Sequence, residues 1–300
     1  MSNVKNWISA ARLRTLPLAF SSIMTGAAIA IGRDAFDLKV FILCLSTTLC
    51  LQVLSNYAND LGDFLRGTDN DARLGPQRAI QSGVISTTQM QKAVILMSVL
   101  SLISGISLIY CSGLGFDGTG MFFLALGLLA ILAAIKYTAG QNPYGYAGLG
   151  DISVFFFFGL LGVLGSYYLH DLSLPFSNDV FIASTIGFLS AAVLNLNNMR
   201  DAVPDKQNGK ITMAVRLGHR NSRIYHFLLV SFGVICLLVH LRYGYSSPLD
   251  LLPLAIIPFL AMHLIRVLKN QKDCSLDPEL KRVALSTFFL SLLLLIAELI

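Results

Sequence analysis

The sequence predicts an all-α integral membrane protein, and three observations indicate this class. Hydrophobic residues make up 55% of the 300 residues and charged residues 13%, whereas a soluble domain carries roughly 25% charged residues. Nine apolar runs approach or reach the length of about 20 residues that crosses a bilayer. Lysine and arginine are dense in every second segment between these runs. Hydrophilic stretches long enough for a second domain are absent from the sequence, so we expect one membrane domain over residues 1–300.

The predicted spans are residues 15–32, 40–58, 93–111, 119–138, 148–169, 180–198, 224–241, 249–268 and 283–300. The first run follows Lys5, Arg12 and Arg14 and contains Ala28-Ile29-Ala30, a small-residue pattern typical of signal-peptide cleavage sites. Because this run is about as long as a full span and many more spans follow, we interpret it as the first transmembrane helix.

The basic residues predict the orientation. With the N-terminus in the cytoplasm, only Arg33, Lys39 and Arg242 of the 22 lysines and arginines fall on the far side, which leaves 19 on the cytoplasmic side. One missed or false span would destroy this asymmetry, so it supports the count of nine. The net charge of +5 therefore reflects membrane orientation and not nucleic-acid binding.

A first acidic cluster ends the second span, in the segment SNYANDLGDFLRGTDND (55–71). Asn56, Asp60 and Asp63 are spaced i, i+4 and i+7, which places them on one helix face, and Asn59 and Asp63 repeat the i, i+4 relation. Carboxylates crowded at a membrane end repel one another unless a cation lies among them. Oxygen ligands without Cys or His suit Mg²⁺ or Ca²⁺, and Mg²⁺ bridges carboxylates to substrate phosphates. The alternative is a solvated helix end with ordinary surface aspartates.

A second acidic cluster follows the sixth span, in the segment NLNNMRDAVPDKQNGKITMAVRLG (195–218). Asn197, Asp201 and Asp205 are spaced i, i+4 and i+8. Pro204 ends or kinks a helix here, which predicts that Asp205 lies on the following loop. The basic neighbours, which favour an anionic phosphate group, are Arg200, Lys206, Lys210 and Arg216.

The two clusters share an Asn-xxx-Asp pattern, four spans apart and on the same predicted membrane face. They fall in the two longest polar loops, 59–91 and 199–222, and long loops in a compact protein usually carry function. We expect two facing half-sites that hold two metal ions around one diphosphate group.

Other polar segments leave two interpretations open. Arg12 and Arg14 precede the first span and suit either membrane anchoring or phosphate contact. Arg73 and Arg78 flank a turn-rich Gly-Pro loop that could fold over the site. The segment KYTAGQNPYGYAGLGD (136–151) contains Lys136, several tyrosines and Asp151, and its tyrosines suit either an interfacial belt or the shielding of a carbocation.

At these residues the sequence resembles the UbiA superfamily of membrane prenyltransferases, over essentially the whole chain. Within it, the closest resemblance is to the branch that prenylates 1,4-dihydroxy-2-naphthoate in menaquinone biosynthesis. Gly67 departs from the common NDxxDxxxD pattern, with Asp69 two residues later as in that branch, and Asp151 stands where the branch usually has Glu. The stretches that carry the resemblance are ARLRTLP, NDLGDFLRGTD followed by RLGPQRAIQSG, YTAGQNPYGYAGLGD, and NNMRDAVPDKQNGKITMAVRLG.

The resemblance implies about nine helices around a central apolar cavity with a cytoplasmic Asp-rich site, in the bacterial cytoplasmic (inner) membrane. The implied reaction transfers a polyprenyl group from polyprenyl diphosphate to 1,4-dihydroxy-2-naphthoate, with loss of CO₂ and diphosphate, and gives demethylmenaquinone. The expected cofactor is Mg²⁺, and the expected partners are these two substrates and membrane lipid.

Site residues follow from these expectations. We expect Asn56, Asp60 and Asp63 to bind one Mg²⁺ and Asp201 and Asp205 the other. The expected catalytic residues are the four aspartates and Lys136. The expected substrate contacts are Asn56, Asn59, Arg14, Arg73, Arg78, Tyr137, Tyr144, Asn197, Arg200 and Lys210, with Lys136, Arg200 and Lys210 on the diphosphate.

Two alternatives remain at this point. One is a prenyltransferase of the same superfamily that acts on another aromatic acceptor, such as 4-hydroxybenzoate. The other is a cation transporter with an acidic vestibule, although transporters usually place ionisable groups near the bilayer midplane and here the acids lie at predicted helix ends.

Overall fold

The computed structural model describes residues 4–68, 77–270 and 273–300. Within these ranges the chain is helical without a strand, and nine helical segments are long and apolar enough to cross a membrane. The predicted fold class and the predicted number of spans are confirmed.

The first span is broken at η1, whereas the second, third and fourth spans are simple helices with conventional starts. Asp37, Ser86 and Asp117 each cap one of them, and their side chains accept hydrogen bonds from backbone N–H groups of the first turn. The elements are α1 (Val4–Ala11), η1 (Leu13–Thr15), α2 (Leu16–Ile31), α3 (Leu38–Leu65), α4 (Thr87–Cys111) and α5 (Gly118–Lys136).

The remaining spans contain more irregular segments. The fifth span is largely π-helical, and the eighth begins as a 3₁₀-helix. The elements are η2 (Tyr144–Ala147), α6 (Gly150–Val154), η3 (Phe155–Gly165), α7 (Ser166–Asp171), α8 (Asp179–Arg200), α9 (Ala202–Gln207), α10 (Met213–Gly244), η4 (Pro248–Ile256), α11 (Ile257–Lys269), η5 (Asp273–Leu276) and α12 (Asp277–Leu299).

Helices reach further into the polar segments than the sequence predicted. Helix α3 continues to Leu65, and α10 already begins at Met213, with a kink at Gly218 where φ is 73°. The two polar loops, predicted as 59–91 and 199–222, are therefore shorter. Asp205 lies on the short helix α9 and not on a loop, because Pro204 occupies the first turn, where a missing N–H costs no helical hydrogen bond.

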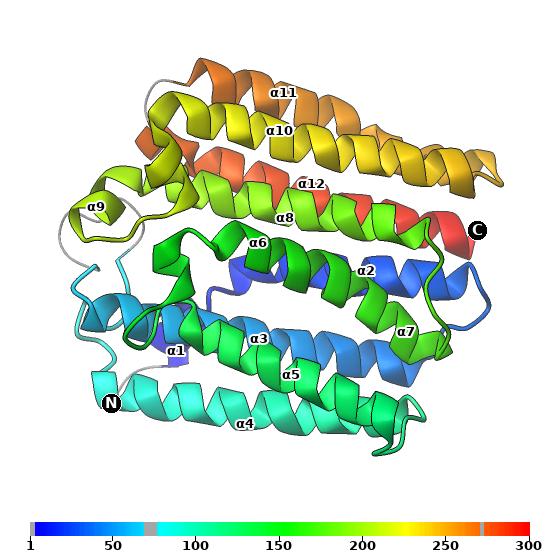
Figure 1. The fold of residues 1–300 in the computed structure, drawn as a ribbon, viewed down its shortest axis with the longest axis horizontal. Helices are drawn as coiled ribbons and strands as arrows, with labels where there is room; N and C mark the ends of the chain where they lie inside the picture. The colour runs from blue at the N-terminus through cyan, green and yellow to red at the C-terminus, as the bar shows by residue number, and fades with distance from the viewer. Residues whose placement is uncertain (1–3, 69–76, 271–272) are drawn as a thin grey trace.

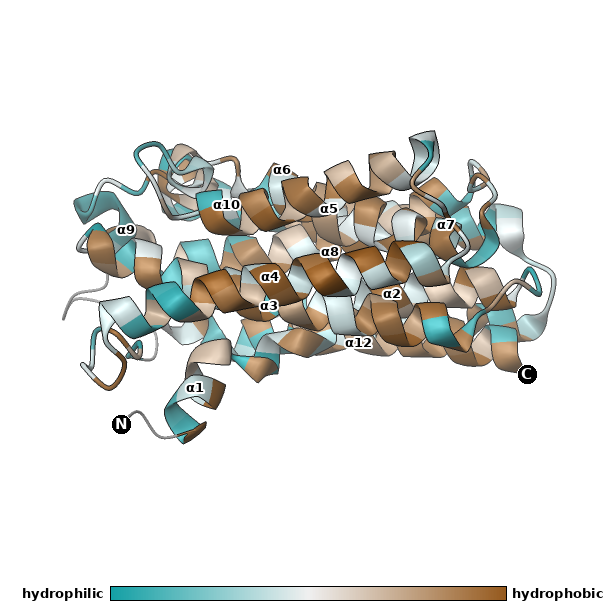
Figure 2. Ribbon diagram, turned by 90° about the horizontal axis from the view of Figure 1, so that it is seen from below, coloured by the Kyte–Doolittle hydropathy of each residue, from teal (hydrophilic) through white to brown (hydrophobic). Residues whose placement is uncertain are grey.

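The helices form one elongated bundle, with α3, α4 and α5 on one side and α8, α10, α11 and α12 on the other (Figure 1). Hydrophobic residues follow the middle of the helices, and hydrophilic residues gather toward the ends, including the end that carries α1 and α9 (Figure 2). The contact between η3 and α8 depends on glycine, since a Cβ on Gly187 would lie 2.9 Å from the carbonyl oxygen of Phe155. This bundle brings the ends of α3 and α8, with their acidic clusters, to the same end.

Candidate active site

The first acidic cluster is buried at the end of α3 and neutralised by arginines. Asp60 and Asp63 are each 1% exposed. Arg12 pairs with Asp60, and Arg78 joins both carboxylates, with Nη1 3.0 Å from Asp60 Oδ1 and Nη2 2.9 Å from Asp63 Oδ2. Arg12 adopts a left-handed backbone conformation between α1 and η1, with φ 49° and ψ 51°, in the chain reversal that leads from α1 to α2. The helical spacing of the aspartates therefore places both on one buried face, as predicted.

Asn56 and Asn59 hydrogen-bond to neighbouring parts of the chain. Asn56 is buried, and its Nδ2 donates to the carbonyl oxygen of Ala11 at 2.8 Å, which leaves its Oδ1 as an acceptor. Asn59 Oδ1 accepts a hydrogen bond from Thr138 Oγ1 at 3.3 Å. Asn56 thus ties the end of α1 to α3, close to the carboxylate that Arg12 contacts.

The second cluster is organised by Arg200. Its Nε and Nη2 donate to the two carboxylate oxygens of Asp201 at 2.9 and 2.6 Å. The same guanidinium donates to Asn197 Oδ1 at 2.8 Å and to Asp277 Oδ1 at 2.5 Å. Arg200 thus orients Asp201 and links α8 to α12, and its expected contact with diphosphate stays a prediction.

Lys210 joins the two clusters. Its Nζ lies 3.8 Å from Asp63 Oδ2 and 3.8 Å from Asp205 Oδ1. The side chain of Lys210 is largely buried between them. Carboxylates from α3 and α9, more than 140 residues apart in the sequence, therefore face one another across a single ammonium group.

Tyr146 completes this group, and sequence reasoning did not select it. Its hydroxyl donates to Asp63 Oδ1 at 2.9 Å and lies 2.6 Å from Thr68 Oγ1. The ring lies 5.4 Å from Lys210 Nζ and 4.9 Å from the guanidinium carbon of Arg66, which are cation–π distances. Burial and the charge of Asp63 raise the pKa of Tyr146 well above its ordinary value, so its hydroxyl remains a donor.

The two tyrosines that were expected at the site make no hydrogen bond to its carboxylates in the described structure. Tyr144 contacts the carbonyl oxygen of Ala133 at 2.9 Å and Ser153 Oγ at 3.1 Å. Tyr137 packs edge-on against Tyr144, with ring centroids 5.3 Å apart. Burial raises the pKa of Tyr137, and the negative charge of Asp151 adds to that effect.

Three further basic residues, Lys136, Arg14 and Arg73, are expected at the site. Lys136 and Arg14 are exposed, and neither makes an ion pair with a residue in the described ranges. Arg73 lies outside the described residues. The structure therefore brings together Asp60, Asp63, Asp205, Arg78 and Lys210, and no ion pair in the described residues links Lys136 or Arg14 to them.

The donor set fits a magnesium ion that is shared with a substrate. In the described part of the chain, no three Asp, Glu, His or Cys side chains converge to form a metal cage. Mg²⁺ does not need one, since it usually binds one or two carboxylates, water and substrate phosphates. In the described residues the cluster contains five aspartates, because Asp277 also pairs with Arg200, and four cations, Arg12, Arg78, Arg200 and Lys210. Because these cations already face carboxylates, a diphosphate would need accompanying cations to bind here.

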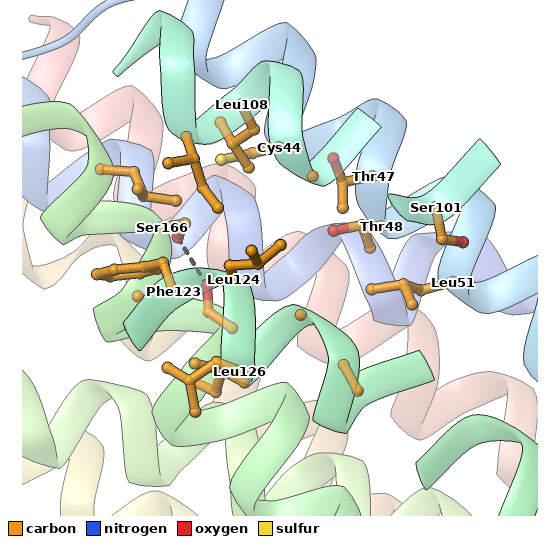
Figure 3. Close-up of a pocket in the computed structure, with 18 of the residues that line it drawn as sticks. Cys44, Thr47, Thr48, Leu51, Ser101, Leu108, Phe123, Leu124, Leu126 and Ser166 are labelled. Carbon is orange, nitrogen blue, oxygen red and sulfur yellow. Dashed lines mark hydrogen bonds between the residues drawn. The ribbon is translucent and has the colours of Figure 1, made fainter. Parts of the chain in front are cut away.

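An apolar cavity of about 150 Å³ lies among α2, α3, α4, α5, η3 and α7. It begins near Leu51, five residues before Asn56 on α3, and extends toward Cys44 and Leu108 (Figure 3). Three of its four hydroxyls form hydrogen bonds within the protein, those of Thr47, Ser101 and Ser166; Ser166, for example, donates to the carbonyl oxygen of Gly162 at 2.7 Å. The cavity is therefore suited to hydrocarbon and not to water.

The chain resembles known proteins along most of its length. A family model described as the UbiA prenyltransferase family matches residues 19–293. The 1,4-dihydroxy-2-naphthoate octaprenyltransferase of Haemophilus influenzae is 44% identical over 294 residues, which cover 97% of this chain and 94% of that protein. The enzyme of the same name from Escherichia coli is 41% identical over 295 residues, with 98% and 94% covered.

Solved structures share the fold. A UbiA homolog from Archaeoglobus fulgidus bound to DMAPP and Mg²⁺ superimposes with a TM-score of 0.61 at 18% identity, over 94% of this chain and 98% of that chain. The apo structure of a UbiA homolog from Aeropyrum pernix K1 gives a TM-score of 0.73 at 13% identity, with 94% and 98% covered. At these identities the likeness shows the fold alone.

Proposed function

The chain belongs to the UbiA prenyltransferase family, and on that premise we propose that it transfers a polyprenyl group from polyprenyl diphosphate to 1,4-dihydroxy-2-naphthoate. CO₂ and diphosphate leave, and the product is demethylmenaquinone. The observation that carries the proposal is the Asp63–Lys210–Asp205 group, which lies on the same bundle as an apolar cavity that begins at Leu51, about three helical turns from Asp63 along α3.

The cavity binds the hydrocarbon part of the donor substrate, and the acidic group binds its diphosphate. The hydrocarbon tail enters the space lined by Thr48, Leu51 and Phe123, where apolar burial stabilises it by about 25 cal/mol per Å². The diphosphate lies at the carboxylates, with Arg78 and Lys210 as direct cationic partners. The same apolar walls exclude water from the allyl cation that forms when the C–O bond breaks.

Two sets of residues would hold Mg²⁺. Asp60 and Asp63, with the free Oδ1 of Asn56, form the first, and Asp201 and Asp205 form the second. When bound, Mg²⁺ neutralises the charge that develops on the leaving diphosphate. Tyr146 keeps Asp63 oriented by donating to Oδ1, and Arg200 does the same for Asp201 by its paired hydrogen bonds.

The side of the membrane follows from the charges. The acidic clusters lie at the end of the bundle to which the basic segments belong, and lysine and arginine collect on the cytoplasmic side of membrane proteins. The proposed site therefore faces the cytoplasm of a bacterial inner membrane.

The acceptor is tested by competition. The protein purified in detergent receives Mg²⁺ and a polyprenyl diphosphate with equal amounts of 1,4-dihydroxy-2-naphthoate and 4-hydroxybenzoate. Prenylated naphthoquinol as the main product supports the proposal. Prenylated hydroxybenzoate as the main product retains the prenyl-transfer chemistry and contradicts the acceptor.

A further inference from the structure

A buried carboxylate outside the diphosphate site has almost no hydrogen-bond partners. Asp151, in the first turn of α6, is 4% exposed. Its Oδ1 is buried without a hydrogen-bond partner among the described residues, and its Oδ2 accepts one long hydrogen bond, from Tyr225 at 3.5 Å. Burying a carboxylate in this way is costly, so a binding role is the natural explanation.

A second unsatisfied side chain lies at the same level of the bundle. Asn195 is 0% exposed, and within the described structure neither its Oδ1 nor its Nδ2 has a partner. It lies two turns from Phe188 on the same face of α8. The Phe188 ring packs 4.7 Å from that of Phe155 and 5.8 Å from that of Phe232.

These ring contacts place three polar groups together. Phe155 follows Asp151 by one turn, and Phe232 follows Tyr225 by two turns. Because α8 runs antiparallel to its two neighbours, Asp151, Asn195 and Tyr225 fall at one level. Leu194, next to Asn195, would lie 3.1 Å from a Cβ on Gly150, which confirms this register. Asp151 and Tyr225 are therefore joined by a hydrogen bond, and Asn195 lies near the same level of the buried interior.

Tyr137 connects this location to the diphosphate site. Its hydroxyl would lie 3.0 Å from a Cβ on Gly150, next to Asp151. Besides burial, the negative charge of Asp151 raises its pKa, and those of Asp63 and Asp205 add smaller effects, so Tyr137 lies within electrostatic range of both groups. An acceptor ring that reaches the allylic carbon from this side meets Asp151.

We propose that Asp151, with Tyr225 and Asn195, binds the hydroxylated aromatic acceptor and that Asp151 takes the proton of the ring hydroxyl next to the attacked carbon. This inference rests on the proposed function. Asp151 then acts as a catalytic base, while Tyr225 and Asn195 are positioning residues.

The electrons balance without a further reagent. The O–H bond breaks and its proton goes to Asp151 Oδ1. The oxygen pair forms a ring carbonyl as the ring carbon bonds to the allylic carbon, and the allylic C–O pair leaves with diphosphate. The resulting β-keto acid loses CO₂, the pair of the broken C–C bond returns to the ring, and the oxygen recovers the proton from Asp151.

Few other charged groups surround Asp151. Tyr225 contacts it from α10, and the Tyr137 hydroxyl lies beside Gly150, the residue before it. Arg216, the cationic side chain that contacts the preceding loop, lies 3.1 Å from a Cβ on Gly148 and donates to the carbonyl oxygen of Ala147. Within the described residues no cation pairs with Asp151, so its charge is available to an acceptor proton.

The test compares Asp151→Asn and Asp151→Glu with Asp117→Asn, an exposed cap at the far end of α5. The kcat/KM for 1,4-dihydroxy-2-naphthoate is measured against pH, and binding of polyprenyl diphosphate with Mg²⁺ is measured separately. Asp151→Asn is expected to lose about 10²- to 10⁴-fold at neutral pH and to recover as alkali ionises the acceptor hydroxyl. Asp151→Glu keeps most activity, Asp117→Asn keeps all of it, and donor binding is unchanged. A loss that is independent of pH, or that includes donor binding, overturns the proposal.

A pair of acceptor analogues tests the same idea on the unaltered protein. In the first analogue, the hydroxyl next to the carboxylate-bearing carbon is methylated, and this analogue should not turn over. In the second analogue, the other hydroxyl is methylated, and this analogue should turn over. Turnover of the first contradicts the role of Asp151. Failure of the unmodified naphthoate to react at all, with another acceptor consumed, instead contradicts the proposed function.

Discussion

Tyr146→Phe is the sharpest test of how the carboxylates are held. The substitution removes one hydroxyl, which donates to Asp63 Oδ1 at 2.9 Å, and keeps the ring that Lys210 and Arg66 face. A hydrogen bond to a charged group contributes about 1.5–3 kcal/mol. At about 1.4 kcal/mol for each factor of ten, prenyl transfer should fall about 10- to 100-fold in kcat/KM.

The assay measures kcat/KM for polyprenyl diphosphate at saturating Mg²⁺, with Thr68→Val as a matched control that removes the other partner of the same hydroxyl. A double-mutant cycle of Tyr146→Phe with Asp63→Asn isolates the pair, because the effect of removing the hydroxyl should shrink once the carboxylate is gone. An unaltered kcat/KM for Tyr146→Phe, or effects that add fully with Asp63→Asn, would refute the reasoning.

Three further predictions follow from the same contacts. Lys210→Met removes the cation between Asp63 and Asp205, and breaking a buried ion pair costs about 3–5 kcal/mol, so the KM for polyprenyl diphosphate should rise at least about tenfold. Lys210→Arg keeps the charge and should raise the KM less. An equal rise in KM for both variants would contradict a charge role. Gly187→Val places a methyl-bearing carbon against Phe155 and should destabilise the bundle by about 1–3 kcal/mol, seen as a lower melting temperature in detergent, whereas an unchanged melting temperature would contradict the tight η3–α8 contact. Gly127→Phe fills open space in the cavity and should lower turnover of long polyprenyl diphosphates more than turnover of short ones. An equal effect on long and short substrates would argue against this cavity as the site of the hydrocarbon tail.

Periodic features of the sequence predicted most of the fold. The nine apolar runs and the distribution of lysine and arginine depend on local composition, so they survive without tertiary information. The helical spacing of Asn56, Asp60 and Asp63 likewise depends only on the geometry of α3. The ends of the helices were less predictable. Helix α3 continues through the polar residue Asp63, because Arg78 pairs with its buried carboxylate.

Tertiary partners of the site were not visible in the pattern. Tyr144 and Tyr146 lie in one aromatic loop, and only the fold decides that the hydroxyl of Tyr146 reaches Asp63. Arg12 reaches Asp60 through a left-handed backbone turn that sequence propensity disfavours. The sequence shows Asp151 only as a departure from a family pattern, whereas the fold shows that its Oδ1 is buried without a hydrogen-bond partner in the described residues.

The most direct test of the central claim follows the carboxyl carbon. Carboxyl-labelled 1,4-dihydroxy-2-naphthoate, polyprenyl diphosphate and Mg²⁺ are supplied to the purified protein and to Asp63→Asn and Asp205→Asn, and labelled CO₂ is measured together with prenylated product. The account predicts that label and product appear in equal amounts, stop when the metal is chelated, and fall at least about 100-fold in both variants. Label released without prenylated product, or full turnover by Asp63→Asn or Asp205→Asn, would contradict it.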